Sequence, residues 1–208
     1  ARWELGVFGG VRSTPGAVVA TVEARREDVR DVLVSLAAEV GLVGASIEDF
    51  SGDAARPIYD RALAIERVQA AAEAARALPI TFTLTARSEN FLRGRVDLDD
   101  TIDRLQAYEA AGADVLMAPG LPDLGAVRAV CAALKKPVNF MAGIRGRTHT
   151  VAELEGAGVK RISLATSLYR AAMTGLVEAA REVREHGRFG YLDRTMPTPD
   201  LNAFLHDG

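Results

Sequence analysis

The stretch Thr81–Gly94 decides the fold; it reads Thr-Phe-Thr-Leu-Thr-Ala-Arg-Ser-Glu-Asn-Phe-Leu-Arg-Gly. Its first half, up to Leu84, alternates in the manner of a β-strand, and Pro79 marks the entrance. A dense polar cluster follows at residues 87–90. A buried strand that delivers an Arg and a Glu at its carboxyl end predicts an active-site edge in an α/β protein. A strand end capped by a surface salt bridge is the alternative, which the local sequence leaves open.

Helix and strand patterns alternate outward from this stretch. Apolar residues at helical intervals predict helices over 17–40, 59–78, 98–111, 124–134 and 167–186, with a short one over 199–205. Short apolar runs predict strands at 42–47, 115–118, 137–142 and 161–164. Before three of these strands, at 38–41, 110–112 and 156–158, the chain carries Ala and Gly. Glycine suits the left-handed cap that ends a helix, and a short connection packs the helix back on the next strand.

This alternation predicts a parallel sheet with right-handed crossovers. Short strands with polar residues at their ends favour a TIM-type (β/α) barrel over an open sheet. A closed barrel of this type has eight strands and about 250 residues, whereas the pattern here supplies five strands and an uncertain sixth at 3–8. We therefore expect one barrel domain over 1–208 that lacks the first β/α units, with 187–208 as a C-terminal tail.

Composition excludes several classes of function. Hydrophobic residues make up 49% of the chain and charged residues 25%, which is ordinary for a globular protein. The net charge of -3, without a basic block, gives nucleic-acid binding no electrostatic support. No apolar run is long enough to span a membrane, and the first residues are not a secretory signal. The single Cys131 forms no intrachain disulfide, so we expect a cytoplasmic protein.

Polar side chains gather where the predicted strands end. Glu48 and Asp49 follow one strand, Arg87 follows the next, and Asn139 and Ser163 lie in two later ones. The carboxyl ends of parallel strands meet at one edge, where two carboxylates suit Mg²⁺ and an Arg can grip a substrate carboxylate with two parallel hydrogen bonds. For Asn139 and Ser163, substrate binding and an ordinary hydrogen-bonded strand end are equally compatible with the pattern.

Six segments together resemble the phosphoenolpyruvate mutase/isocitrate lyase superfamily. They are Gly44–Asp49, Pro57–Asp60, Leu84–Gly94, Asp99–Ile102, Gly112–Val115 and Lys136–Asn139, and the likeness covers residues 14–170. The resemblance implies a barrel that binds Mg²⁺ and a small 2-oxo acid or phosphonate, and that breaks or forms a C–C or P–C bond through an enolate. It implies that Glu48 helps to hold the hydrated metal and that Arg87 binds the substrate carboxylate.

Three departures from the family pattern are visible. Gly6 and Phe8 stand roughly where metal-binding carboxylates would be, a Ser-Gly substrate loop has no counterpart, and the Lys-x-Cys-Gly gating motif is absent. The last departure points away from isocitrate and methylisocitrate cleavage and towards the phosphonomutase, phosphonopyruvate hydrolase and oxaloacetate decarboxylase branches.

Two hypotheses therefore stand. The first is a Mg²⁺-dependent lyase or phosphonomutase-like enzyme, and the second is a non-catalytic relative kept for binding or assembly. Because exposed sheet edges promote association, and because the family often exchanges its last helix between subunits, we also expect a homo-oligomer with residues 167–186 as a dimer element.

Overall fold

The computed structural model describes residues 42–206, with side chains up to residue 203. The strand expected at 3–8, the helix expected at 17–40, and Gly6 and Phe8 lie outside the described residues. The chain divides into two compact units, one ending at Ala165 and the other beginning at Thr166. Each unit is described by itself, and the prediction of one domain over the whole chain stays a prediction.

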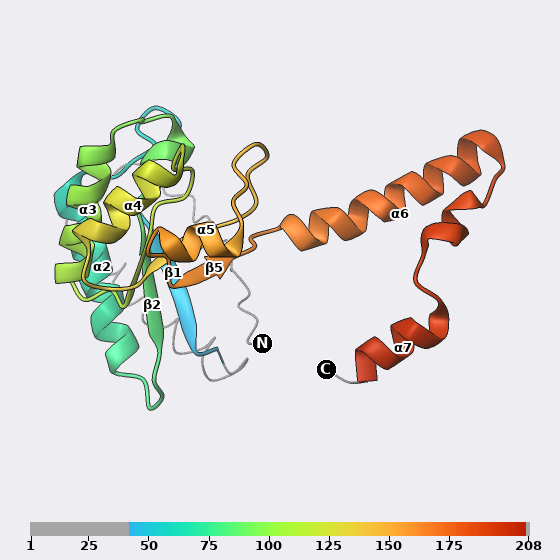
Figure 1. Ribbon diagram of the computed structural model, residues 1–208. Coiled ribbons are helices and arrows are strands. Elements are labelled where there is room, and N and C mark those ends of the chain that lie inside the picture. Colours follow the sequence, from blue (N-terminus) through green and yellow to red (C-terminus); the bar gives the residue numbers. More distant parts are fainter. Residues whose placement is uncertain (1–41, 207–208) are drawn as a thin grey trace. The chain divides into compact units, whose positions relative to one another are not determined.

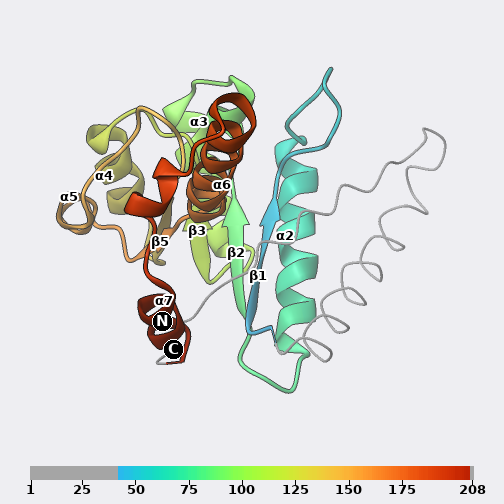
Figure 2. The same cartoon turned by 90° about the vertical axis from the view of Figure 1, so that its right-hand side faces the viewer.

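The first unit contains a parallel five-stranded sheet (Figures 1 and 2). Its strands are β1 (Gly44–Glu48), β2 (Thr83–Arg87), β3 (Val115–Met117), β4 (Val138–Met141) and β5 (Arg161–Ser163). Between them run α2 (Arg61–Arg76), α3 (Leu98–Ala110), α4 (Leu124–Ala133) and α5 (Val151–Gly156). The strands lie side by side in chain order. A barrel has this order, whereas a doubly wound sheet reverses its strand order, so the predicted parallel α/β architecture of the barrel type is confirmed.

The strand register divides the sheet into two chemically different faces. Ile47 pairs with Ala86, and Leu116 pairs with Val138. These side chains join the main hydrophobic core, which also contains residues of α2, α3, α4 and α5. The helices therefore cover one face of the sheet, as the stacking of α2, α3 and α4 beside β1 and β2 shows (Figure 1). Side chains on either side of these positions along each strand point to the opposite face.

That opposite face is concave. Arg161 on β5 donates from Nη1 to Thr85 Oγ1 on β2 at 3.5 Å. In a flat sheet, strands three places apart would be separated by about 14 Å. A sheet that curls towards this face, as in a barrel, brings such side chains together across β3 and β4.

Glycines end two of the helices as the sequence predicts. Gly112 and Gly158 follow α3 and α5 with φ values of 109° and 100°. A Cβ at Gly158 would lie 2.9 Å from the Cys131 Cβ on α4, so this position excludes a side chain on steric grounds as well. The close approach of these helix ends to α2 and α4 depends on both properties.

Strand β2 ends at Arg87, as expected from the sequence, although the alternating pattern itself stops at Leu84. A 3₁₀ turn, η1 (Asn90–Arg93), follows almost at once. The β1 partner extends the ladder, because Glu48 pairs directly with Arg87.

The second unit consists of α6 (Ser167–His186), the 3₁₀ turn η2 (Gly190–Arg194) and α7 (Thr198–His206). Helix α6 has the predicted bounds and contains no buried residue. Its large apolar side chains are exposed: Leu168, Tyr169, Leu176, Val177 and Val183. Among the helices of residues 42–206, none has the length and apolar character needed to cross a bilayer.

Candidate active site

Arg87 occupies the carboxyl end of β2, on the concave face of the sheet. Its Nε and Nη2 both donate to Glu89 Oε1, at 2.9 and 2.6 Å. Nη2 also lies 3.4 Å from Glu48 Oε2 on the neighbouring strand. The Arg87 side chain is 10% exposed and that of Glu48 30%, so Glu48 is the more accessible carboxylate of the cluster. The structure therefore brings together the two residues that the sequence predicted as catalytic.

Glu89 is a site residue to which the sequence reasoning gave no role. It is fully buried, and its Oε2 accepts no hydrogen bond from the residues that the structure describes. Arg93 Nη2 lies 3.6 Å from Oε2. Burial raises the pKa of Glu89 and the nearby Glu48 adds to the rise, although Arg87 acts in the opposite direction. The signal in the sequence was the Arg-x-Glu spacing, since residues two apart at a strand end share a face.

Asn139 and Ser163 lie on the same concave face. Asn139 Nδ2 donates to Ser163 Oγ and to Met117 Sδ, both at 3.1 Å. Asn139 is 2% exposed and its Oδ1 has no hydrogen-bond partner in the structure. A buried amide oxygen without a partner is costly, so a ligand or a bound water that donates to it would be stabilised.

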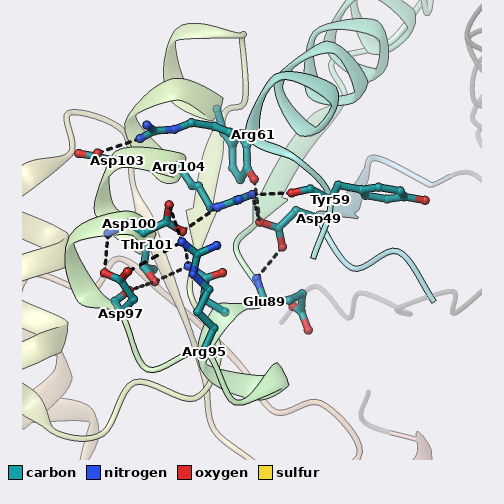
Figure 3. A network of polar contacts seen from close by, with 12 residues as sticks. Asp49, Tyr59, Arg61, Glu89, Arg95, Asp97, Asp100, Thr101, Asp103 and Arg104 are labelled. Carbon is teal, nitrogen blue, oxygen red and sulfur yellow. Dashed lines mark hydrogen bonds and ion pairs between the residues drawn. The ribbon is translucent and has the colours of Figure 1, made fainter. Parts of the chain in front are cut away.

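Asp49 lies in a buried network on the helix side of the sheet. Its Oδ1 accepts from the Glu89 backbone N–H at 2.8 Å, and its Oδ2 accepts from Arg104 Nη1 at 3.3 Å (Figure 3). Oδ2 also accepts from Tyr108 Oη at 2.7 Å. Burial, followed by the Asp49 charge, raises the pKa of Tyr108, so its hydroxyl stays protonated and donates. The predicted metal-binding role of Asp49 stays a prediction. In the structure both of its carboxylate oxygens already accept hydrogen bonds.

The network continues to the start of α3. Asp100 accepts from Asn90 Nδ2 and from Arg104 Nε, each at 2.8 Å, and lies 3.1 Å from Arg95 Nη2. Burial opposes ionisation of Asp100, but these hydrogen bonds and the charge of Arg104 outweigh it and lower the pKa. Asp97 caps α3 by accepting from the Asp100 backbone N–H at 2.9 Å (Figure 3). The residues after β2 are thus tied to α3.

The loop after Asp49 is fixed beside the same cluster. Phe50 and Ile58 form an isolated antiparallel bridge. The Arg93 guanidinium stacks on the Phe50 ring, 3.4 Å from its centroid. This stacking joins the loop after β1 to η1, next to the carboxyl end of β2.

The concave face offers a limited set of ligands for a cation. Among residues 42–206, no three Asp, Glu, His or Cys side chains are grouped as a metal site. Glu48 provides an accessible carboxylate. The Asn139 Oδ1 is a further oxygen that could bind a cation or its water, because it accepts no hydrogen bond from the described residues. Mg²⁺ prefers oxygen ligands, keeps several waters and is commonly held by one or two carboxylates. The donors present fit a hydrated Mg²⁺ that is held through Glu48.

Comparison with known proteins identifies relatives of this chain. The chain is 29% identical over 186 residues to the uncharacterized protein Rv1998c of Mycobacterium tuberculosis (strain ATCC 25618 / H37Rv), covering 89% of this chain and 67% of that protein. It is 48% identical to a candidate lyase/mutase from Burkholderia cenocepacia J2315, whose structure matches with a TM-score of 0.81 over 87% of this chain and 65% of that one. The chain thus spans about two thirds of the length of these relatives.

More distant structures share the fold. A phosphonopyruvate hydrolase solved in complex with oxalate and Mg²⁺ matches with a TM-score of 0.70 at 21% identity, over 88% of this chain and 65% of that one. The sequence model of the phosphoenolpyruvate phosphomutase family matches residues 20–184. This match covers most of the chain and confirms the resemblance inferred from the strand-end motifs. The chain belongs to the phosphoenolpyruvate phosphomutase family.

Proposed function

We propose that the chain forms part of a Mg²⁺-dependent lyase or phosphonomutase-like enzyme that acts on a small 2-oxo acid. The observation that supports this proposal is the pair of Arg87 and Glu48 on adjacent strands, with Nη2 and Oε2 3.4 Å apart on a concave face. A cation-binding carboxylate and a carboxylate-binding guanidinium are the two groups that an oxo acid chelated to a metal requires.

Each residue has a distinct part in the proposal. Arg87 binds the substrate carboxylate, principally through Nη1, because Nε and Nη2 already donate to Glu89. Glu48 holds the hydrated cation. Asn139 and Ser163 orient the remaining polar group of the substrate. The bound cation would supply electrostatic stabilisation of the oxyanion that develops at the 2-oxo position.

Asp49 has a smaller part in this proposal than the sequence prediction gave it. For direct contact with the cation, its carboxylate would have to give up donors from Tyr108, Arg104 or the Glu89 backbone. Loss of such partners would leave buried polar groups unsatisfied, which is costly. We therefore place the cation on Glu48 and treat Asp49 as a support for it.

The test combines binding with turnover. Oxalate binding in the presence of MgCl₂ is measured by calorimetry, and pyruvate release from oxaloacetate and from phosphonopyruvate is measured against enzyme-free blanks. We expect Glu48→Gln and Arg87→Lys each to lower oxalate affinity at least about tenfold, since each removes a charge-assisted contact. The matched variants Glu66→Gln and Arg128→Lys change exposed helix residues and should bind as the wild type does.

Absence of both oxalate binding and pyruvate release in the wild-type protein would contradict the enzyme proposal. That outcome would favour the non-catalytic hypothesis.

We also propose that a second copy of the chain covers the apolar stripe of α6. Tyr169, Leu176 and Val183 recur every seven residues, and the exposed fractions of these three side chains are 66%, 60% and 38%. Such spacing is typical of helices that pack against another helix. A homo-oligomer is the partner arrangement that this stripe supports.

A further inference from the structure

We propose that Glu89 is a positioning residue that sets the direction of the Arg87 guanidinium on the concave face. The inference rests on the proposed function only for the identity of the ligand that Arg87 receives. Its basis is the juxtaposition of a buried carboxylate with two nitrogens of one guanidinium, at 2.9 and 2.6 Å.

The side-chain contacts of Glu89 serve Arg87. One oxygen, Oε1, receives both hydrogen bonds, whereas Oε2 accepts none within the described part of the chain and lies 3.6 Å from Arg93. Glu89 is fully buried, where hydrogen bonds between charged groups are stronger than in water. A long Arg side chain has many rotamers, and two bonds to one fixed oxygen restrict it to one orientation.

The backbone of Glu89 is fixed from the other side of the sheet. Its N–H donates to Asp49 at 2.8 Å, and Asp49 is held in turn by Tyr108 and Arg104 of α3. Figure 3 shows the Glu89 side chain pointing away from Asp49. Glu89 therefore connects the buried network behind the sheet with the guanidinium in front of it.

This arrangement defines which part of Arg87 faces a ligand. Glu89 occupies Nε and Nη2, and Glu48 lies 3.4 Å from Nη2. None of the side chains described, up to residue 203, accepts a hydrogen bond from Nη1, and we assign this nitrogen to the ligand carboxylate. Without the Glu89 charge, Glu48 is the nearest remaining acidic partner, and Arg87 would turn towards it. The same change would weaken ligand binding and tie up the carboxylate proposed to hold the cation.

The first readout needs no ligand. The Arg87 Nε–H resonance is assigned in a ¹⁵N spectrum by its loss in Arg87→Lys, and its exchange with water is measured. We expect slow exchange in the wild type and exchange at least about tenfold faster in Glu89→Gln, where a charged acceptor becomes neutral. Glu66→Gln should leave the resonance unchanged. A wild-type Nε–H that exchanges as freely as a solvated arginine would overturn the proposal without any variant at position 89.

The second readout is oxalate affinity in MgCl₂. Glu89→Gln should weaken it at least about tenfold, with Glu66→Gln as control. An Arg87 resonance in Glu89→Gln that is identical to the wild type, together with a lowered unfolding midpoint, would show a merely structural role and overturn the proposal. If the wild type binds no oxalate, the proposed function fails, and Nε–H exchange still decides whether Glu89 positions Arg87.

Discussion

Glu48 and Asp49 are neighbours in the chain, yet their carboxylates lie in different environments. Glu48 pairs in register with Arg87 and faces the concave side, whereas Asp49 is 3% exposed and meets Tyr108 and Arg104 on the helix side. Strand geometry explains this difference, because successive side chains point to opposite faces. At the scale of residues, the two acids that look like a pair in the sequence have separate tasks.

Asp100 allows this network to be tested by pH. The pKa of Asp100 is lower in the folded protein than in the unfolded chain. Ionised Asp100 therefore stabilises the fold at pH values above its pKa in the unfolded chain. This contribution is lost as the pH falls through the pKa of Asp100 in the folded protein. We expect Asp100→Asn to reduce the free energy of unfolding near neutral pH by about 1.5–3 kcal/mol, through weaker hydrogen bonds with Asn90 and Arg104.

The measurement is urea unfolding of both proteins at several pH values. The difference between wild type and Asp100→Asn should shrink towards acid pH. A difference that stays constant with pH would contradict the role assigned to the Asp100 charge. Asp99→Asn, in the same turn of α3, serves as the control, because Asp99 makes no ion pair or side-chain hydrogen bond with the described residues.

At the scale of elements, the helix-to-strand connections carry the packing. Gly112 and Gly158 take the left-handed conformation in the same place after α3 and α5. Each also lies against the preceding helix of the sheet: a Cβ at Gly112 would be 3.0 Å from the Ala72 Cβ of α2. The recurring Ala-Gly pattern therefore reflects a steric requirement where α3 and α5 end and the chain passes against α2 and α4.

A matched pair of substitutions tests this requirement. Gly158→Ala should destabilise the protein by about 1–3 kcal/mol, because the new Cβ both disfavours the left-handed conformation and meets Cys131 at 2.9 Å. Gly156→Ala, two residues earlier at the end of α5, meets nothing within 4 Å and should be neutral or stabilising by up to about 1 kcal/mol. Equal thermal midpoints for the two variants would contradict the packing argument.

The sequence predicted the order and type of these elements because each amphipathic helix and each short apolar strand carries a local signal. It also predicted Glu48 and Arg87, since both end a strand of the expected sheet. The sequence did not indicate that Glu89 is fully buried or that its backbone N–H is held by Asp49. These features depend on the pairing of β1 with β2 and on the hydrogen bonds of Asp49 with Glu89 and with Tyr108 of α3, which join residues 39 or more positions apart.

At the scale of the whole molecule, the described sheet has β1 and β5 as its outer strands, and α6 adds an uncovered apolar stripe. Exposed strand edges and apolar helix faces both favour association between chains. Association through α6 would bury the apolar side chains that are exposed in the second unit.

Substitution on α6 tests the proposed homo-oligomer. Leu176→Glu places a charge in the middle of the stripe and should shift the protein towards monomers in sedimentation velocity. We expect the dissociation constant of the oligomer to rise at least about tenfold. Thr174→Glu adds the same charge to the opposite face of α6 and should sediment as the wild type does. A wild-type protein that is monomeric at high concentration would contradict the proposal.

The hydrogen bond between Asp49 and the Glu89 amide has a consequence for protein engineering. A designer who transplants the Arg-Ser-Glu segment at the end of β2 onto another barrel would move these side chains without Asp49, which holds the Glu89 amide. The segment has to be moved with Asp49 and with the part of α3 that carries Arg104 and Tyr108. The transferable module is therefore a strand end, the turn after its neighbour and one helix.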